Sequence, residues 1–117
     1  METYEVEEAR IGDIPAVAVR GEVDISAVDV LDAALESAIL KSVGAFIVDL
    51  TEVSFLDSSG LAAIVRARAL LEREDRRLAV VCPPGPARRI FELTNMQELF
   101  AIYSSPQEAA DALVPAD

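Results

Sequence analysis

Residues 45–71 read AFIVDLTEVSFLDSSGLAAIVRARALL, and this stretch decides the fold class. Its first part, Ala45 to Leu50, is a short and nearly continuous apolar run, as expected of a central strand covered by helices. Asp57 or Ser58 is placed to cap a helix that follows. That helix has an apolar stripe at helical spacing, formed by Leu61, Ile64, Val65, Ala69 and Leu71. The stretch therefore predicts a buried strand followed by a helix.

The same alternation continues toward the C-terminus. Proline suits the first turn of a helix and asparagine tolerates a left-handed cap, so we expect a helix from Pro86 to about Asn95. Apolar runs on either side of it predict strands, and capping signals predict a last helix. These elements are a strand at Leu78 to Cys82, a strand at Phe100 to Tyr103 and a helix from about Ser105 to Leu113.

Upstream of residue 45 the pattern predicts a hairpin and one helix. Tyr4 to Ile11 and Ala16 to Gly21 flank a turn at Gly12-Asp13, which is typical of two paired strands. Ser26, with Asp29 three positions later, resembles a capping box, so we expect a helix that begins there and stops at Gly44.

The order of elements favours an α/β domain with a mixed, mostly parallel sheet of about five strands and about four helices. The 117 residues have the size of one ordinary domain, so we expect a single domain over residues 1–117. A hydrophobic content of 52% excludes a disordered chain. No apolar run approaches the roughly 18 residues of a membrane helix, so membrane insertion is not expected.

The net charge and the residue types that are rare or absent exclude several classes of function. The formal net charge of −11 makes nucleic acid a poor partner and favours a partner with a basic surface. The absence of histidine excludes Ser-His-Asp catalysis and histidine-containing zinc sites. The single cysteine, Cys82, lies in an apolar run and is interpreted as a core residue. The acidic N-terminus is unlike a secretory signal, which leads us to expect a cytoplasmic protein.

The candidate site is the segment Phe55-Leu56-Asp57-Ser58-Ser59-Gly60-Leu61, between the predicted strand and helix. A phosphate on Ser58 would gain from the positive end of the helix, yet it would lie close to Asp57 and Asp24. Attraction by the helix end and repulsion by the nearby acids would let phosphorylation change the binding properties of this segment. On residue chemistry alone, a simple helix cap with a glycine for close packing is the more economical interpretation.

Four segments in order make the chain similar to STAS domains, and more narrowly to bacterial anti-sigma factor antagonists of sporulation and the general stress response. They are Gly21-Glu22-Val23-Asp24, Val48-Asp49-Leu50, residues 55–61, and Arg89-Ile90-Phe91-Glu92-Leu93-Thr94. Val23 stands where leucine is commoner and Asn95 where glycine is common, and neither change puts the fold in doubt.

The resemblance implies a phosphorylation-switched binding protein without catalytic residues, metal or cofactor. Ser58 would be phosphorylated by a kinase that is itself the anti-sigma factor, and Asp24 would affect recognition by that kinase. Asp57, Ser59, Gly60 and Leu61 would complete the recognition loop. The unphosphorylated form would bind the anti-sigma factor and release sigma, the phosphorylated form would not, and a PP2C-type phosphatase would reset it.

Other functions fit the sequence less well. The same fold also serves in scaffold subunits of stress-signalling assemblies and of membrane lipid transporters, which the element pattern cannot separate. A receiver-type phosphoaspartate at Asp49 lacks its acidic pair and its lysine, so Asp49 is interpreted as a turn residue at the strand end. Arg88 and Arg89 could contact an acidic partner, but a solvated helix face pairing with Glu92 is the simpler interpretation. Nucleotide hydrolysis is disfavoured by the absence of a Gly-x-x-x-x-Gly-Lys loop.

Overall fold

A computed structural model describes residues 3–114 and contains the predicted alternation of strands and helices. In chain order the elements are β1 (Tyr4–Ile11), β2 (Ile14–Val23), the 3₁₀ turn η1 (Ile25–Ala27), α1 (Val28–Leu40), β3 (Phe46–Leu56), α2 (Ser58–Glu72), β4 (Leu78–Val81), α3 (Pro86–Leu93), the 3₁₀ turn η2 (Met96–Glu98), β5 (Ala101–Tyr103) and α4 (Pro106–Leu113). The α/β class and the mixed, mostly parallel sheet are confirmed. No helix among these residues is long and apolar enough to cross a bilayer.

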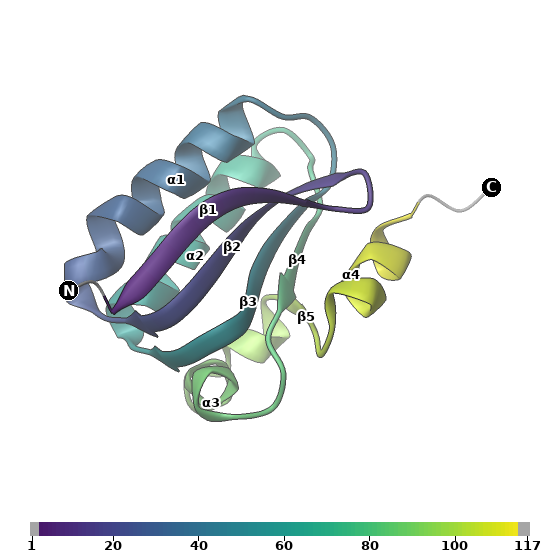
Figure 1. The fold of residues 1–117 in the computed structure, drawn as a ribbon. Coiled ribbons are helices and arrows are strands. Elements are labelled where there is room, and N and C mark those ends of the chain that lie inside the picture. The colour runs from purple at the N-terminus through teal and green to yellow at the C-terminus, as the bar shows by residue number, and fades with distance from the viewer. Residues whose placement is uncertain (1–2, 115–117) are drawn as a thin grey trace.

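The five strands lie side by side in the order in which they occur in the chain. β1 pairs antiparallel with β2, and each later strand pairs in parallel with the one before it. Helices α1 and α2 cover one face of the sheet, while α4 lies on the other face (Figure 1). Because the parallel strands end at one edge, the loops that follow β2 and β3 open on the same side.

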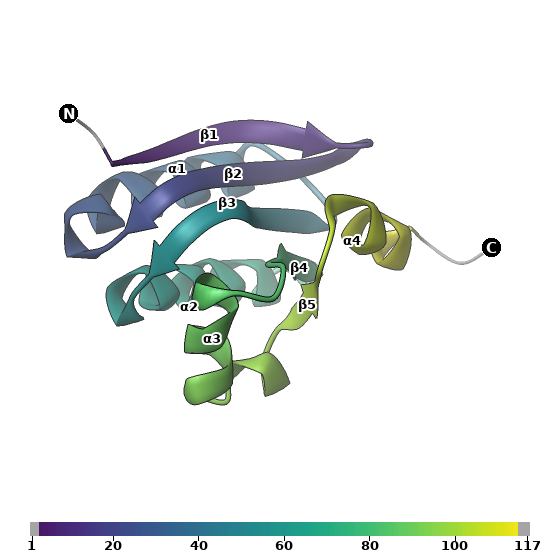
Figure 2. The same ribbon diagram turned by 60° about the horizontal axis from the view of Figure 1, so that its bottom comes forward.

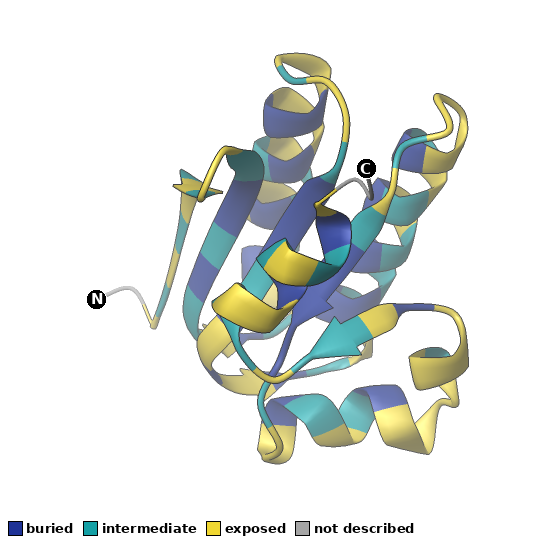
Figure 3. Ribbon diagram, turned by 90° about the vertical axis from the view of Figure 1, so that its right-hand side faces the viewer, coloured by how far each residue is buried: buried dark blue, intermediate teal, exposed yellow. Residues whose placement is uncertain are grey.

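Two apolar clusters hold these layers together. The larger one packs α1, α2 and α3 against the sheet, and in it Phe91 of α3 meets the ring of Phe100 edge-on at 5.8 Å between centroids. The smaller one joins α4 to the opposite face through Ala16, Ile47, Ala79, Val81, Ala109 and Leu113. Figure 3 shows the buried residues concentrated in the central strands. Cys82 is fully buried, as its apolar surroundings predict.

β3 is longer than predicted and extends to Leu56. Beyond Leu50 it has lost β4 as a neighbour and pairs only with β2, whose register shifts twice along the way. The exposed pair Thr51 and Glu52 breaks the alternation that would have announced a strand. The prediction that Asp49 marks the strand end is therefore wrong: Asp49 lies inside β3, where its carboxylate accepts a hydrogen bond from the amide of Thr51.

The extension of β3 carries its end past the end of β4, with α3 packed against it, as the two views together show (Figures 1 and 2). The end of β3 and the loop after it thus lie beside β2, at one corner of the molecule. That corner contains the candidate site.

Candidate functional site

The ends of β2 and β3 bring the two predicted site segments together. Val23 is in register with Leu56, and the amide of Asp57 donates to the carbonyl of Val23 at 3.1 Å. Asp24 and Asp57, each the next residue of its strand, are therefore neighbours across the strand pair. The placement of Asp24 beside the Ser58 loop follows directly from this parallel register.

Asp57 caps α2, as one of the two predicted alternatives had it. Its Oδ1 atom accepts hydrogen bonds from the amides of Ser59 at 3.0 Å and Gly60 at 3.1 Å. The Ser59 hydroxyl donates to the same oxygen at 2.5 Å. One carboxylate oxygen thus fixes the backbone of the first turn and occupies the hydroxyl of the second serine.

Ser58 differs from Ser59 in both exposure and bonding. It is the first residue of α2 and its side chain is exposed, whereas Ser59 is only partly accessible. Within residues 3–114 the Ser58 hydroxyl forms no hydrogen bond, while that of Ser59 is held by Asp57. Of the two adjacent hydroxyls, Ser58 is the one that an external group can reach.

Three backbone amides at the start of α2 are already hydrogen-bonded and are not free to bind a phosphate. The amides of Ser59 and Gly60 are bonded to the Asp57 side chain, and the amide of Leu61 donates to the Asp57 carbonyl at 3.0 Å. A phosphate on Ser58 would therefore find these three amides already bonded to Asp57. Sequence alone does not show how many amides one cap satisfies.

Gly60 and Leu61 hold the loop in place from below. A β-carbon on Gly60 would lie 2.5 Å from Cδ1 of Leu56 and 2.8 Å from Cγ1 of Val23, so only glycine fits without displacing core side chains. Leu61 is 5% exposed and belongs to the main core. Both residues position the loop, and neither presents a side chain at the surface.

Asp24 is also a cap, for the short turn η1. Its Oδ1 atom accepts hydrogen bonds from the amide of Ser26 at 2.9 Å and from its hydroxyl at 2.6 Å. These two hydrogen bonds from Ser26 lower the pKa of the Asp24 carboxyl, which keeps it anionic. The prediction that Ser26 caps this region is therefore wrong. Ser26 donates to the cap, and α1 begins two residues later, at Val28.

Gly21 lies at a register shift near the end of β2, which the strand pattern alone did not predict. Its φ of +88° is in the left-handed region, and a β-carbon there would lie 2.1 Å from the carbonyl oxygen of Thr3. The register with β3 shifts between Gly21 and Glu22, and the amide of Glu22 turns to donate to Thr3. A glycine inside an apolar strand pattern is the signal of such a bulge.

Three arginines form hydrogen bonds or ion pairs within the chain, and the single cysteine is buried. Arg88 donates to the carbonyl of Cys82 at 2.9 Å rather than pairing with Glu92. Arg66 forms two hydrogen bonds with Asp32 across the α1–α2 interface, and Arg68 pairs with Glu72 one turn on. Burial raises the pKa of the Cys82 thiol to about 11, so this cysteine is not an activated nucleophile.

Comparisons by family model, by sequence and by structure all find STAS domains or anti-sigma factor antagonists. The model of the STAS domain family matches residues 5–109. An anti-sigma-B factor antagonist of Listeria monocytogenes is 32% identical over 84 residues, which cover 72% of this chain and 74% of that protein. One of Staphylococcus aureus is 29% identical over 86 residues, covering 74% and 80%. The crystal structure of an anti-sigma factor antagonist from Mycobacterium paratuberculosis has a TM-score of 0.88 to this chain at 26% identity, covering 96% and 95%.

Proposed function

The chain belongs to the STAS domain family and, within it, to the anti-sigma factor antagonists, and on this premise we propose how it works. Its unphosphorylated form binds an anti-sigma factor that has serine kinase activity and so releases sigma. Phosphorylation of Ser58 by that kinase ends the binding, and a PP2C-type phosphatase restores it. The chain acts as a binding protein with no catalytic activity of its own.

The observation that carries the proposal is the difference between the two serines. The Ser58 hydroxyl is exposed and forms no hydrogen bond within the described part of the chain, whereas the Ser59 hydroxyl is bound to Asp57. A kinase must place the attacking hydroxyl in line with the phosphate of its nucleotide, which a free and exposed side chain permits. This supports Ser58 as the acceptor.

The charges at the same corner support a switch by repulsion. A phosphoryl group adds about −1.5 to −2 charge at neutral pH. On Ser58 it would adjoin the carboxylates of Asp57 and Asp24, while three amides of the helix start are already bonded. The phosphate therefore stays at the surface, where a partner would have to desolvate it. A coupling of about 1–3 kcal/mol is enough to change occupancy several-fold to a hundredfold, without any refolding.

Asp24 contributes to kinase recognition in this proposal. One of its oxygens is committed to Ser26, and no arginine or lysine among residues 3–114 pairs with the carboxylate. An arginine of the kinase could bind it and align Ser58 for phosphoryl transfer.

The experiment is to incubate the chain with ATP and a purified anti-sigma factor kinase of the same organism. Intact mass should rise by one phosphate on wild type and on Ser59→Ala, and Ser58→Ala should remain unmodified. Labelling that persists in Ser58→Ala would contradict the assignment. ATP with the chain alone should give neither hydrolysis nor labelling, since the chain itself is proposed to be inactive.

A further inference from the structure

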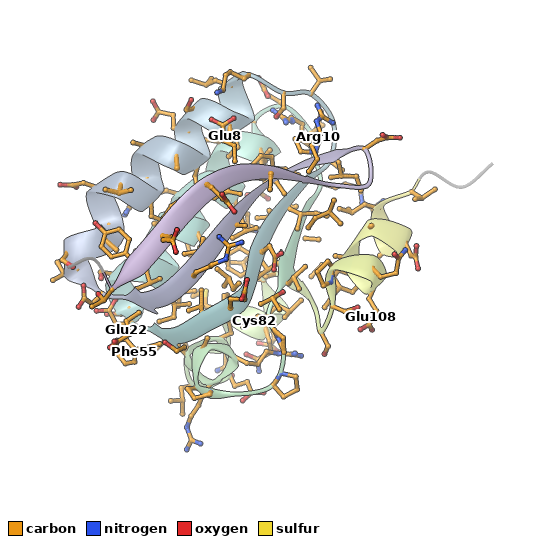
Figure 4. The ribbon with its side chains drawn as sticks, in the orientation of Figure 1. Glu8, Arg10, Glu22, Phe55, Cys82 and Glu108 are labelled. Atoms are coloured by element: carbon orange, nitrogen blue, oxygen red, sulfur yellow. The ribbon has the colours of Figure 1, made fainter. Side chains whose placement is uncertain are left out.

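Two exposed apolar side chains lie at the Ser58 corner. Ile25, next to Asp24, is 74% exposed, and Phe55, three residues before Ser58, is 47% exposed. Phe55 is in register with Glu22 of β2, and Figure 4 shows these two side chains together at the end of the strands. A single exposed apolar residue is common on protein surfaces. Here one lies on each of the two segments that form the site, Ile25 after β2 and Phe55 near the end of β3.

The charges around these side chains are acidic and uncompensated. Glu22, Asp24 and Asp57 take part in none of the ion pairs formed between residues 3 and 114. The first 57 residues, which supply all three, contain 13 of the 21 acidic residues and only three of the ten basic ones. The apolar side chains are thus bordered by negative charge that the chain itself does not neutralise.

Exposed apolar side chains bordered by negative charge favour some binding partners over others. A second copy of the chain would bring acids against acids, and an anionic lipid surface or nucleic acid would be repelled for the same reason. A protein surface with an apolar centre bordered by arginine or lysine would bury Ile25 and Phe55 and neutralise the carboxylates.

We propose that Ile25 and Phe55 are the apolar anchors of this chain for the anti-sigma factor, which receives them in an apolar patch bordered by basic residues. The inference rests on the proposed function and adds which residues of that site contribute to which step of binding. The anchors supply affinity, the acids supply orientation and rate of encounter, and Ser58 at the same corner controls whether the surface can be desolvated.

The test measures the Kd of Ile25→Ser and Phe55→Ser for the purified anti-sigma factor, without ATP hydrolysis, at several salt concentrations. Each variant should bind at least about tenfold more weakly than wild type, since truncating a buried anchor commonly costs that much. The slope of affinity against salt should not change, because no charge is lost. Val43→Ser is the matched control. Val43 is 87% exposed in the loop before β3, at the opposite end of that strand, and its variant should bind as wild type does.

The outcomes separate this inference from the proposed function. If both variants bind as tightly as Val43→Ser while Ser58→Glu binds more weakly, the anchors are wrong and the switch stands. If wild type does not bind the anti-sigma factor, both fail. Self-association in sedimentation that Ile25→Ser and Phe55→Ser abolish would assign the surface to a second copy instead. Binding of wild type to phosphatidylglycerol vesicles would assign it to lipid. Equal thermal midpoints of all variants make sure that binding, not folding, is compared.

Discussion

At the scale of single residues, one structural pattern recurs with different consequences. Asp24 and Asp57 each accept a hydrogen bond from the amide and from the hydroxyl of the residue two positions on. In the first case the residue between them is apolar Ile25, and in the second it is Ser58. The aspartate fixes the turn in both segments, and the middle side chain is exposed in each.

Asp24→Asn separates the charge of this residue from its role as a cap. Asparagine keeps an oxygen that can accept the Ser26 bonds, so the thermal midpoint should change little at neutral pH. The rate of Ser58 phosphorylation should fall, because an arginine of the kinase loses its anionic partner. Rate and midpoint are measured on the same sample. An unchanged rate would remove Asp24 from recognition, and a lowered midpoint alone would make it purely structural.

At the scale of elements, the bulge in β2 connects the sheet to the site. Gly21 adopts a left-handed conformation beside Thr3, and the register with β3 shifts directly after it, three residues before Asp24. The site therefore depends on a strand irregularity as well as on the loop that contains Ser58.

Gly21→Ala should destabilise the chain and slow phosphorylation together. The new β-carbon would adopt a strained φ and also collide with the backbone of Thr3. Gly12→Ala is the matched control, since Gly12 has a φ of +62° and no atom within 4 Å of the added carbon. The control should lose only about 1–2 kcal/mol from the left-handed conformation. Chemical denaturation of both variants checks this, and equal losses would contradict a role for the Thr3 contact.

Elements with strong local signals were predictable from the sequence. Asp57 as a cap, Pro86 at the start of α3 and Asn95 in the left-handed region each follow from the backbone preference of one residue type. The extension of β3 was not predictable, because it depends on pairing with β2, whose register is irregular. In addition, Thr51 and Glu52 are both exposed, which breaks the alternation of buried and exposed residues that identifies a strand. Nor did the sequence show that Asp24, rather than Ser26, caps η1, since both residue types are good caps.

The sequence was enough to predict that the candidate segments meet, but it did not predict the contacts that each of their residues makes. Parallel pairing of β2 and β3 was enough to place Asp24 beside Ser58. Side-chain geometry determines the rest: which hydroxyl is free, which amides are bonded and which side chains reach the surface. That geometry moves Leu61 into the core and leaves Ile25 and Phe55 outside.

At the scale of the whole molecule, we propose that residues 1–117 form one cooperative unit, and Cys82 reports on it. The thiol is fully buried and its pKa is raised to about 11 by burial, so at pH 8 it is protonated and shielded. A thiol reagent should therefore react with the native chain only through unfolding, with a rate that rises with denaturant in parallel with the loss of helical signal. Rapid labelling without denaturant would contradict both the burial and the single unit.

The charge distribution of the molecule fits the same account, because the acidic N-terminal half ends at the corner where a basic partner is expected to bind. A phosphate on Ser58 would add charge beside Asp24 and Asp57, which take part in no ion pair between residues 3 and 114.

The central claim is that phosphate on Ser58 alone switches affinity for the anti-sigma factor. The most direct measurement compares the Kd of the unmodified chain with that of the same chain carrying phosphoserine, introduced genetically at position 58, so that no kinase reaction is needed. The phosphoserine should weaken binding about 5-fold to 150-fold, and Ser58→Ala should bind like the unmodified chain. Equal affinity of the phosphorylated and unmodified chains would contradict it.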